Sequence, residues 1–173
     1  MKNNTKRIIF GALIILNCTA IFLFSNQIAD DSSATSSRVV NFVSEIIPAI
    51  KNMQEPDKTI LKEEILTPIV RKGAHFSIYG MLGILTINFI LTFENKKMYK
   101  KIIYAFLFCM FYAITDEFHQ YFIPGRSAEI RDVLIDSSGA LTGILFVIIL
   151  ITIIKRIKNK KEAMLSWKKK WYT

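Results

Sequence analysis

Ionisable side chains stand at helical intervals within three otherwise apolar segments of the sequence. Arg71, His75 and Tyr79 follow one another in four-residue steps, which places them on one face of a helix. Two later segments carry carboxylates at similar spacing, together with an imidazole and an amide. The complete set is Arg71, Lys72, His75, Tyr79, Asp116, His119, Gln120, Arg126, Arg131, Asp132 and Asp136. An unpaired carboxylate in hydrocarbon costs about 2.5 kcal/mol or more, so these groups are expected to face inward and find partners.

The basic residues of this set suit an anion. Arg71 and Lys72 lie near the start of one predicted helix, and Arg126 and Arg131 flank the start of another. Helix N-termini present free N–H groups that favour phosphate or carboxylate. With carboxylates beside them, the two histidines can also carry protons in chemistry on a phosphate- or amide-bearing headgroup.

A divalent metal ion is an alternative occupant of the same region. Asp116 and His119 have the three-residue spacing at which a carboxylate and an imidazole share a metal in helical bundles. His75 with Asp132 or Asp136 would complete a shell of oxygen and nitrogen ligands. The candidate metal ligands are therefore His75, Asp116, His119 and Asp136.

A purely structural role is the third interpretation. In it, the three arginines neutralise the three aspartates, and the resulting network holds three helices together. Small residues can hold a bundle at lower desolvation cost, so a functional role is favoured. An ion-coupled transporter is disfavoured, because neither an inverted repeat nor a broken helix is visible in the sequence.

Composition indicates which elements position these residues. The 173-residue chain is 51% hydrophobic, with a mean hydropathy of +0.32, yet 21% of its residues are charged. Its apolar runs each approach the ~20 residues that cross ~30 Å of hydrocarbon. The sequence therefore predicts an all-α integral membrane four-helix bundle, a multi-pass protein of the cell membrane, and excludes a soluble globular domain. The predicted spans are about 8–24, 68–93, 102–122 and 129–154.

The basic residues outside the spans set the expected orientation. The net charge of +9 lies mostly before the first span, in the connection 94–101 and in the tail 155–173. Positively charged flanks stay in the cytoplasm, so both termini are expected there, and residues 25–67 form an outer segment. The polar set then falls in one outer layer. Because the bases flank membrane spans instead of forming a basic face, nucleic acid is excluded as a partner.

A cleaved signal peptide is the alternative for the first span. A basic start followed by an apolar run is also the signature of a leader sequence. The run over residues 8–24 is longer than a usual leader core, and no small-x-small cleavage site follows it promptly. Cleavage would leave the orientation of the other three spans unchanged.

Local signals predict where the helices begin. Thr67 followed by Pro68 is typical of an N-cap with proline in the first helical position, so the second span is expected to start there. Ser127 is a similar cap candidate for the fourth helix, with Glu129 in its first turn. In the outer segment, two short helices are expected, one from near residues 36–37 to before Pro48 and one over 57–66. They would lie on the membrane surface or cap the bundle.

Glycines predict a close contact between two of the spans. Gly139 and Gly143 form a GxxxG pair in the fourth span, and Gly80 and Gly83 thin the second span in the same way. Such small residues let helix backbones approach each other in a membrane.

Four motifs follow one another along most of the chain. They are Phe24-Ser25-Asn26-Gln27, Arg71-Lys72-Gly73-Ala74-His75-Phe76, Asp116-Glu117-Phe118-His119-Gln120 and Arg131-Asp132-Val133. They are accompanied by Tyr79 and Gly83, by Phe122-Ile123-Pro124-Gly125-Arg126, and by Asp136 and Gly139. In this combination the sequence resembles the VanZ-like membrane proteins. The long outer segment and the basic tail depart from the family pattern.

The resemblance implies a single VanZ-like membrane domain over residues 1–173 and adds Gln27 and Glu117 to the candidate pocket. The family is named after a bacterial member encoded with glycopeptide resistance genes and associated with reduced susceptibility to teicoplanin. We therefore expect an envelope or glycopeptide resistance factor whose outer pocket binds a lipid-linked or phosphate-bearing envelope component. The expected partners are membrane lipids and a lipid-linked envelope precursor or a glycopeptide. The resemblance implies no reaction, so an enzyme that modifies a lipid headgroup stays the alternative.

Overall fold

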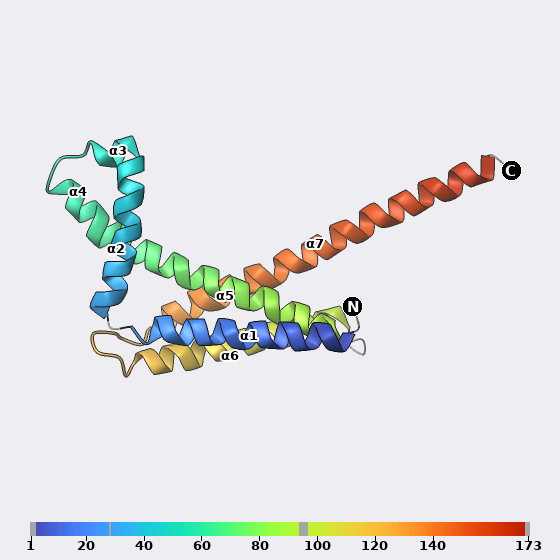
Figure 1. Ribbon diagram of the computed structural model, residues 1–173, viewed down its shortest axis with the longest axis horizontal. Coiled ribbons are helices and arrows are strands. Elements are labelled where there is room, and N and C mark those ends of the chain that lie inside the picture. The colour runs from blue at the N-terminus through green and yellow to red at the C-terminus, as the bar shows by residue number, and fades with distance from the viewer. Residues whose placement is uncertain (1–2, 28, 94–96, 172–173) are drawn as a thin grey trace.

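The computed structural model describes residues 3–27, 29–93 and 97–171, and every element in these ranges is helical (Figure 1). The elements are α1 (Asn3–Ser25), α2 (Ala29–Ile46), α3 (Pro48–Lys51), α4 (Asp57–Ile60), the π-helical η1 (Leu61–Leu66), α5 (Thr67–Leu91), α6 (Met98–Gln120) and α7 (Ile130–Trp171). The expectation of an all-α fold is confirmed.

Four helices are long and apolar enough to cross a membrane. They comprise Asn3–Ser25, Asp57–Leu91, Met98–Gln120 and Ile130–Leu165. Large apolar side chains are exposed along their outer faces; Ile8, Phe111 and Leu134 are examples. A soluble protein would bury such side chains, whereas lipid tails solvate them without cost. The predicted number of helices that could span a membrane is confirmed.

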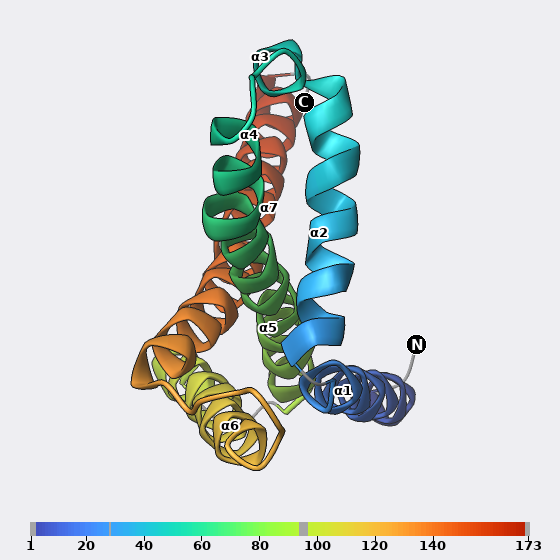
Figure 2. The same cartoon turned by 90° about the vertical axis from the view of Figure 1, so that its left-hand side faces the viewer.

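Helix α5 lies at the centre of the bundle. It packs most extensively on α7 and also contacts α1, α6 and α2. In Figure 1, α1 and α6 end where α5 and α7 begin, while the N-terminus lies at the opposite end of the bundle. Figure 2 shows α2 rising beside α5 from the end of α1. We call the end that contains Ser25, Thr67, Gln120 and Ile130 the polar end.

Glycines set the contact between α5 and α7. A Cβ atom added to Gly139 would lie 2.2 Å from the carbonyl oxygen of Phe76, and one added to Gly143 would lie 2.0 Å from that of Gly80. From the other helix, a Cβ on Gly83 would lie 2.2 Å from the carbonyl oxygen of Ala140. These distances leave no room for a side chain, so the two backbones are in direct contact. The predicted close approach is confirmed.

Helix α5 begins at Thr67 as predicted, but the predicted N-cap role of Thr67 is wrong. The backbone is helical from Asp57 through α4, η1 and α5, and Leu66, which precedes Thr67, already has helical dihedral angles. Pro68 has no N–H, so it cannot donate to a carbonyl in the preceding turn. The wider π-helical turn of η1 precedes it, and the Thr67 hydroxyl donates to the Lys62 carbonyl at 2.8 Å. The Thr67 hydroxyl thus bonds to a carbonyl of the preceding helical turn instead of capping a helix N-terminus.

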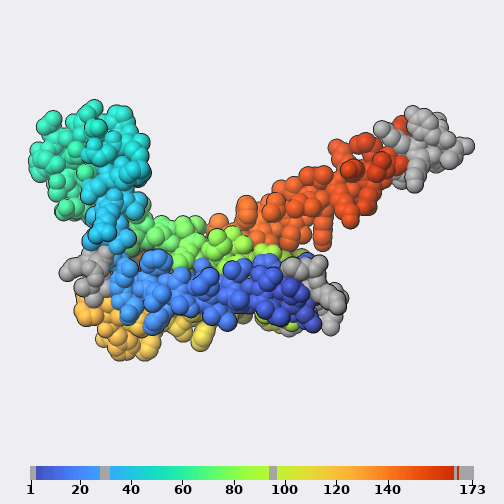
Figure 3. All heavy atoms as spheres, viewed as in Figure 1, coloured from blue at the N-terminus to red at the C-terminus, as the bar shows by residue number. Residues whose placement is uncertain are grey.

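Helix α7 differs from expectation at both ends. It begins at Ile130, after Glu129, whose carbonyl accepts from the N–H groups of Asp132 and Val133. Ser127 therefore lies too far upstream to be the cap, and Glu129 precedes the first turn. At the other end, α7 continues to Trp171 through the basic tail, and Figure 3 shows this part standing away from the remainder of the molecule.

Helix α2 is longer than expected, because it begins at Ala29 and not near residue 36. Ser32, Ser36, Val40 and Ser44 recur at four-residue steps and are buried where α2 packs on α5 and η1. The hydroxyls of Ser36 and Ser44 donate to carbonyls one turn earlier, at 3.1 and 2.7 Å, so burial leaves neither unsatisfied. Tertiary packing therefore overrides the weak helix propensity of serine.

Basic side chains donate hydrogen bonds to carbonyl groups at the C-terminal end of α5, which lies opposite the polar end. Arg7 of α1 donates to the Thr92 carbonyl at 3.1 Å and lies 4.2 Å from the centre of the Phe93 ring. Lys101 of α6 donates to the Phe93 carbonyl. These carbonyls carry the negative end of the helix dipole, so the bases there stabilise the bundle as well as marking orientation.

Replacing Gly139 by alanine is expected to destabilise the protein by about 1–3 kcal/mol, because the added methyl forces α5 and α7 apart. Gly73→Ala is the matched control, since a Cβ there meets nothing within 4 Å. It should be neutral or stabilising by up to ~1 kcal/mol, as alanine favours helix. Thermal unfolding in detergent measures both, and equal melting temperatures for the two variants would contradict the glycine contact.

Candidate functional site

Most of the sequence-predicted polar residues converge on one pocket at the polar end. The pocket has a volume of about 90 Å³ and receives side chains from the start of α5, the end of α6, the connection 121–129 and the start of α7. We call it the polar pocket; its lining residues are Arg71, Lys72, His75, Glu117, Gln120, Gly125, Arg126, Ser127, Glu129, Asp132, Ile135 and Asp136. The predicted meeting of three helices is thus realised in space.

Asp116 lies behind the polar pocket and joins three helices. Its Oδ2 accepts hydrogen bonds from Ser25 Oγ at 2.9 Å, Tyr79 OH at 3.1 Å and Gln120 Nε2 at 3.3 Å. Only 6% of the residue is exposed. Three donors on one oxygen replace the water that a buried carboxylate loses, so Asp116 ties α1 and α5 to α6.

Glu117 holds the connection between α6 and α7. Its buried carboxylate accepts from the backbone N–H of Glu129 at 2.8 Å. A charge-assisted bond to a backbone donor is stronger than a neutral one. Glu117 therefore fixes the residues that precede α7, and these residues form one wall of the polar pocket.

The aspartates of α7 pair with α5, but not through arginine. Lys72 Nζ lies 2.5 Å from Asp132 Oδ1 and 3.9 Å from Glu129 Oε2, while His75 Nδ1 lies 3.6 Å from Asp136 Oδ2. Among the residues that the structure describes, none of the three candidate arginines makes an ion pair with an aspartate. The expected arginine–aspartate network is therefore wrong, because the shorter side chains of Lys72 and His75 already occupy the positions facing α7.

Arg126 is held at one nitrogen and unsatisfied at two others. Its Nη1 donates to Gln120 Oε1 at 2.8 Å, whereas Nε and Nη2 are buried without a hydrogen-bond partner. Burial and the nearby positive charge of Arg71 lower the pKa of Arg126 from its ordinary value. Arginine stays protonated at neutral pH in proteins, so a positive group with free donors faces the polar pocket.

Five sequence-predicted residues do not line the polar pocket: Asp116 and its donor Tyr79 lie behind it, and His119, Arg131 and Gln27 lie elsewhere. His119 stacks on Phe22 of α1 with ring centres 4.7 Å apart, and Arg131 is exposed to the surroundings of α7. Gln27 lines a neighbouring cavity of about 160 Å³ between α1, α2 and α5, whose walls are mostly apolar. Arg71 and His75 line both cavities, so the two lie side by side.

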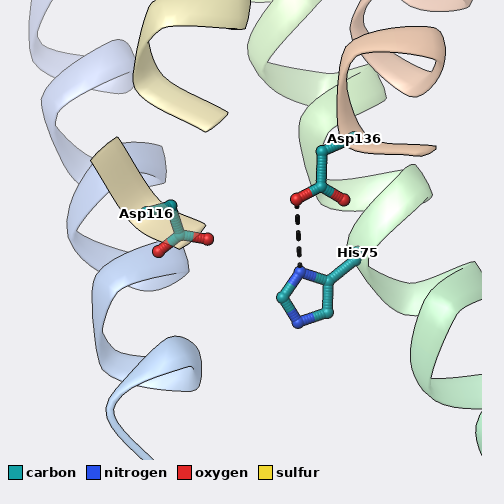
Figure 4. Close-up of side chains that lie close together, drawn as sticks. All are labelled: His75, Asp116 and Asp136. Atoms are coloured by element: carbon teal, nitrogen blue, oxygen red, sulfur yellow. Dashed lines mark ion pairs between the residues drawn. The ribbon is translucent and has the colours of Figure 1, made fainter. Parts of the chain in front are cut away.

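Ligand atoms of three residues come close enough to share a metal ion. One atom each from His75, Asp116 and Asp136 lie within 4.8 Å of one another, and Figure 4 shows the three side chains pointing toward a common centre. His119 is not in this group, since it is directed to Phe22. The spacing of Asp116 and His119 along the sequence therefore does not produce a shared site.

Sequence reasoning missed two residues. Ser25 is fully buried and donates to Asp116, and Glu129 lines the polar pocket. A signal for Ser25 was available, because it follows an apolar run and stands in the same motif as Gln27. Glu129 carries no such signal, since exposed acids near helix starts are common.

Residues 10–152 match the sequence profile of the VanZ/LLP1 family. The chain belongs to this family. No curated protein and no solved structure shows significant similarity to it. The matched region of this VanZ/LLP1 protein contains Ser25, every residue of the polar pocket and the glycine contact of α5 with α7.

Replacing Tyr79 by phenylalanine is expected to destabilise the VanZ/LLP1 protein by about 1–2 kcal/mol, because Asp116 loses one of three donors in a buried place. Tyr121→Phe is the control, since Tyr121 is 64% exposed. Chemical unfolding in detergent, followed by far-ultraviolet circular dichroism, measures both variants. A Tyr79→Phe protein as stable as the control would show that Asp116 does not depend on this bond.

Proposed function

We propose that this VanZ/LLP1 membrane protein binds a phosphate-bearing, lipid-linked component of the cell envelope in the polar pocket. The observation that carries the proposal is the state of Arg126, whose Nε and Nη2 are buried and unpartnered. A buried donor without a partner costs about 1–3 kcal/mol, so a ligand that accepts from it gains affinity. The planar guanidinium favours phosphate or carboxylate oxygens, which accept two parallel hydrogen bonds.

The position of Arg71 strengthens the case for an anion. Arg71 and Arg126 both line the polar pocket and repel each other. The nearby positive groups differ in availability, because Lys72 is already paired with Asp132 and Glu129. Within the described part of the chain neither Arg71 nor Arg126 has an ion-pair partner, so two guanidinium groups in one pocket favour a single anion between them. The carboxylates that also line the pocket would restrict this anion to one that can donate a hydrogen bond or carry a cation.

The neighbouring cavity supports a lipid-linked ligand. Its apolar walls come from Ile21, Phe24, Ala74 and Ile78, and it shares Arg71 with the polar pocket. A hydrocarbon chain in this cavity would keep the apolar surroundings that it has in the bilayer, so the cavity can receive a lipid tail without a desolvation cost. An amphiphile with its phosphate at Arg126 and its chain beside α1 would use both cavities at once.

The proposed biological role follows from the ligand class and from the family. A protein that holds a lipid-linked envelope precursor, or that binds a glycopeptide such as teicoplanin, would act as an envelope or antibiotic resistance factor. The polar pocket would then face the outer leaflet and both termini would face the cytoplasm. The segregation of Arg7 and Lys101 to the end opposite the pocket supports this orientation.

A membrane enzyme is the second candidate function. His75 and Asp136 both line the polar pocket at a separation of 3.6 Å, which suits a histidine oriented by a carboxylate. With a phosphate at Arg126, His75 would donate a proton to, or accept one from, the bound headgroup. The reaction class would be the modification of a lipid headgroup.

Substituting Arg126 by alanine is expected to weaken binding of a polyprenyl monophosphate in detergent by about 10- to 100-fold, because hydrogen bonds to charged groups contribute about 1.5–3 kcal/mol. Arg131→Ala is the matched control: it removes the same charge from an exposed position outside the pocket and should change binding less than about threefold. Equal losses of affinity in the two variants would show that only the net charge of the protein, and not the position of Arg126, affects binding. Release of inorganic phosphate in the same incubation, abolished by His75→Ala, would favour the enzyme.

Single cysteines are expected to report the orientation in whole cells. In a protein whose Cys18 and Cys109 are replaced by serine, Ser127→Cys should react with a membrane-impermeant maleimide. Lys160→Cys should react only after the membrane is permeabilised, since it lies in the basic tail. The reverse labelling pattern would place the polar pocket in the cytoplasm and exclude an outer-leaflet ligand.

A further inference from the structure

The side chains of His75, Asp116 and Asp136, behind and beside the polar pocket, form a largely buried group in which a protonated His75 is the nearest counter-charge for the two carboxylates. Asp116 is 6% exposed and Asp136 is 2% exposed. Their nearest oxygens and one nitrogen of His75 lie within 4.8 Å of one another, on three different helices (Figure 4). Within the described part of the chain, no lysine or arginine makes an ion pair with either aspartate.

Two carboxylates this close stay ionised in a buried place only beside a cation, and a single protonated His75 would offset only one of the two charges. The hydrogen bonds that Asp116 accepts from Ser25, Tyr79 and Gln120 leave its second oxygen without a counter-charge, because all three converge on Oδ2. The separation of 3.6 Å between His75 Nδ1 and Asp136 Oδ2 exceeds the length of a hydrogen bond. Asp136 is therefore almost fully buried with no strong partner.

From this geometry we infer that His75, Asp116 and Asp136 bind one divalent metal ion, of the Mn²⁺ or Zn²⁺ type. Two carboxylate oxygens and one imidazole nitrogen suit these ions. Ligand bonds of about 2.0–2.2 Å place two ligands of one ion at most about 4.4 Å apart, so a small movement of the side chains closes the group around it. Three protein ligands leave positions open for water or an anion.

The open positions would face the polar pocket. His75 and Asp136 line the pocket, while Asp116 approaches from behind it. An anion held by Arg126 would then also reach the metal ion. The positive charge of the metal ion would offset the excess of carboxylates in the pocket. Binding of the ion itself does not depend on the proposed anion.

The rigid framework around the group supports a fixed site. Asp116 is oriented by Ser25 and Tyr79, and Asp136 stands one turn before Gly139, whose backbone contacts that of Phe76 next to His75. Metal sites need ligands whose rotamers are held by surrounding packing and hydrogen bonds. The ligands of this group meet that condition on all three helices.

The test measures binding of Mn²⁺ and of Zn²⁺ alone to the full chain, purified in detergent, treated with EDTA and dialysed into phosphate-free buffer. Isothermal titration and the electron paramagnetic resonance signal of Mn²⁺ should give one ion per chain. Loss of a group that hydrogen-bonds a metal ligand usually lowers metal affinity by 10- to 100-fold. Loss of a ligand itself, as in Asp136→Asn or His75→Ala, should therefore weaken binding by at least about tenfold. His119→Ala is the matched control and should leave the affinity unchanged, since His119 stacks on Phe22.

Two outcomes overturn the inference. Wild-type protein that binds neither ion at millimolar concentration shows that protons on His75 or the aspartates, and not a metal ion, balance the charge of the group. Equal weakening by His119→Ala and His75→Ala places the ion elsewhere. If a variant fails to fold, the number of ions bound per chain of the wild-type protein still decides between a metal ion and protons. Anion binding is measured separately in EDTA, so failure of the metal site and failure of the Arg126 site are distinguishable.

Discussion

Direct contact between the α5 and α7 backbones sets the geometry on which the remainder of the polar end depends. The contact of Gly139 with Phe76 lies one turn from Asp136 and beside His75. Any side chain at Gly139 would separate the two helices and with them the carboxylate from the imidazole. In a membrane, where apolar surface gains little from association, such close packing and a few polar contacts supply most of the force that holds helices together.

Burial of acidic groups is the second constraint, and the protein meets it in three ways. Asp116 accepts from neutral donors, Glu117 accepts from a backbone N–H, and Asp132 pairs with Lys72. Asp136 has only a distant histidine, and Arg126 has two unpartnered nitrogens. Groups that a folded protein leaves unsatisfied in a pocket are those from which a ligand gains most, so the polar end has the character of a binding site.

Much of the fold was predictable from the sequence because a bilayer permits few structures. Apolar runs of about 20 residues must be helices, since hydrocarbon offers no partner for the backbone. The meeting of Arg71, Gln120 and Asp136 followed from the alternating direction of successive helices. Helix caps were less predictable, although Thr67 and Ser127 are residue types that often cap helices. The helix continues through η1 into α5, so Thr67 is not a cap. The hydrogen bond from the Glu129 N–H to Glu117 fixes the start of α7 after Ser127.

What the sequence by itself determined is the number of helices that could span a membrane, the excess of bases at the end opposite the polar end and the close approach at the glycines. Each depends on residue type and spacing along the chain. Which polar groups pair was decided only by the tertiary structure. His119 and His75 look equivalent in sequence, yet one stacks on Phe22 and the other faces Asp136. The reason is physical: side-chain partners depend on the rotation and distance between helices, which a spacing rule within one helix does not contain.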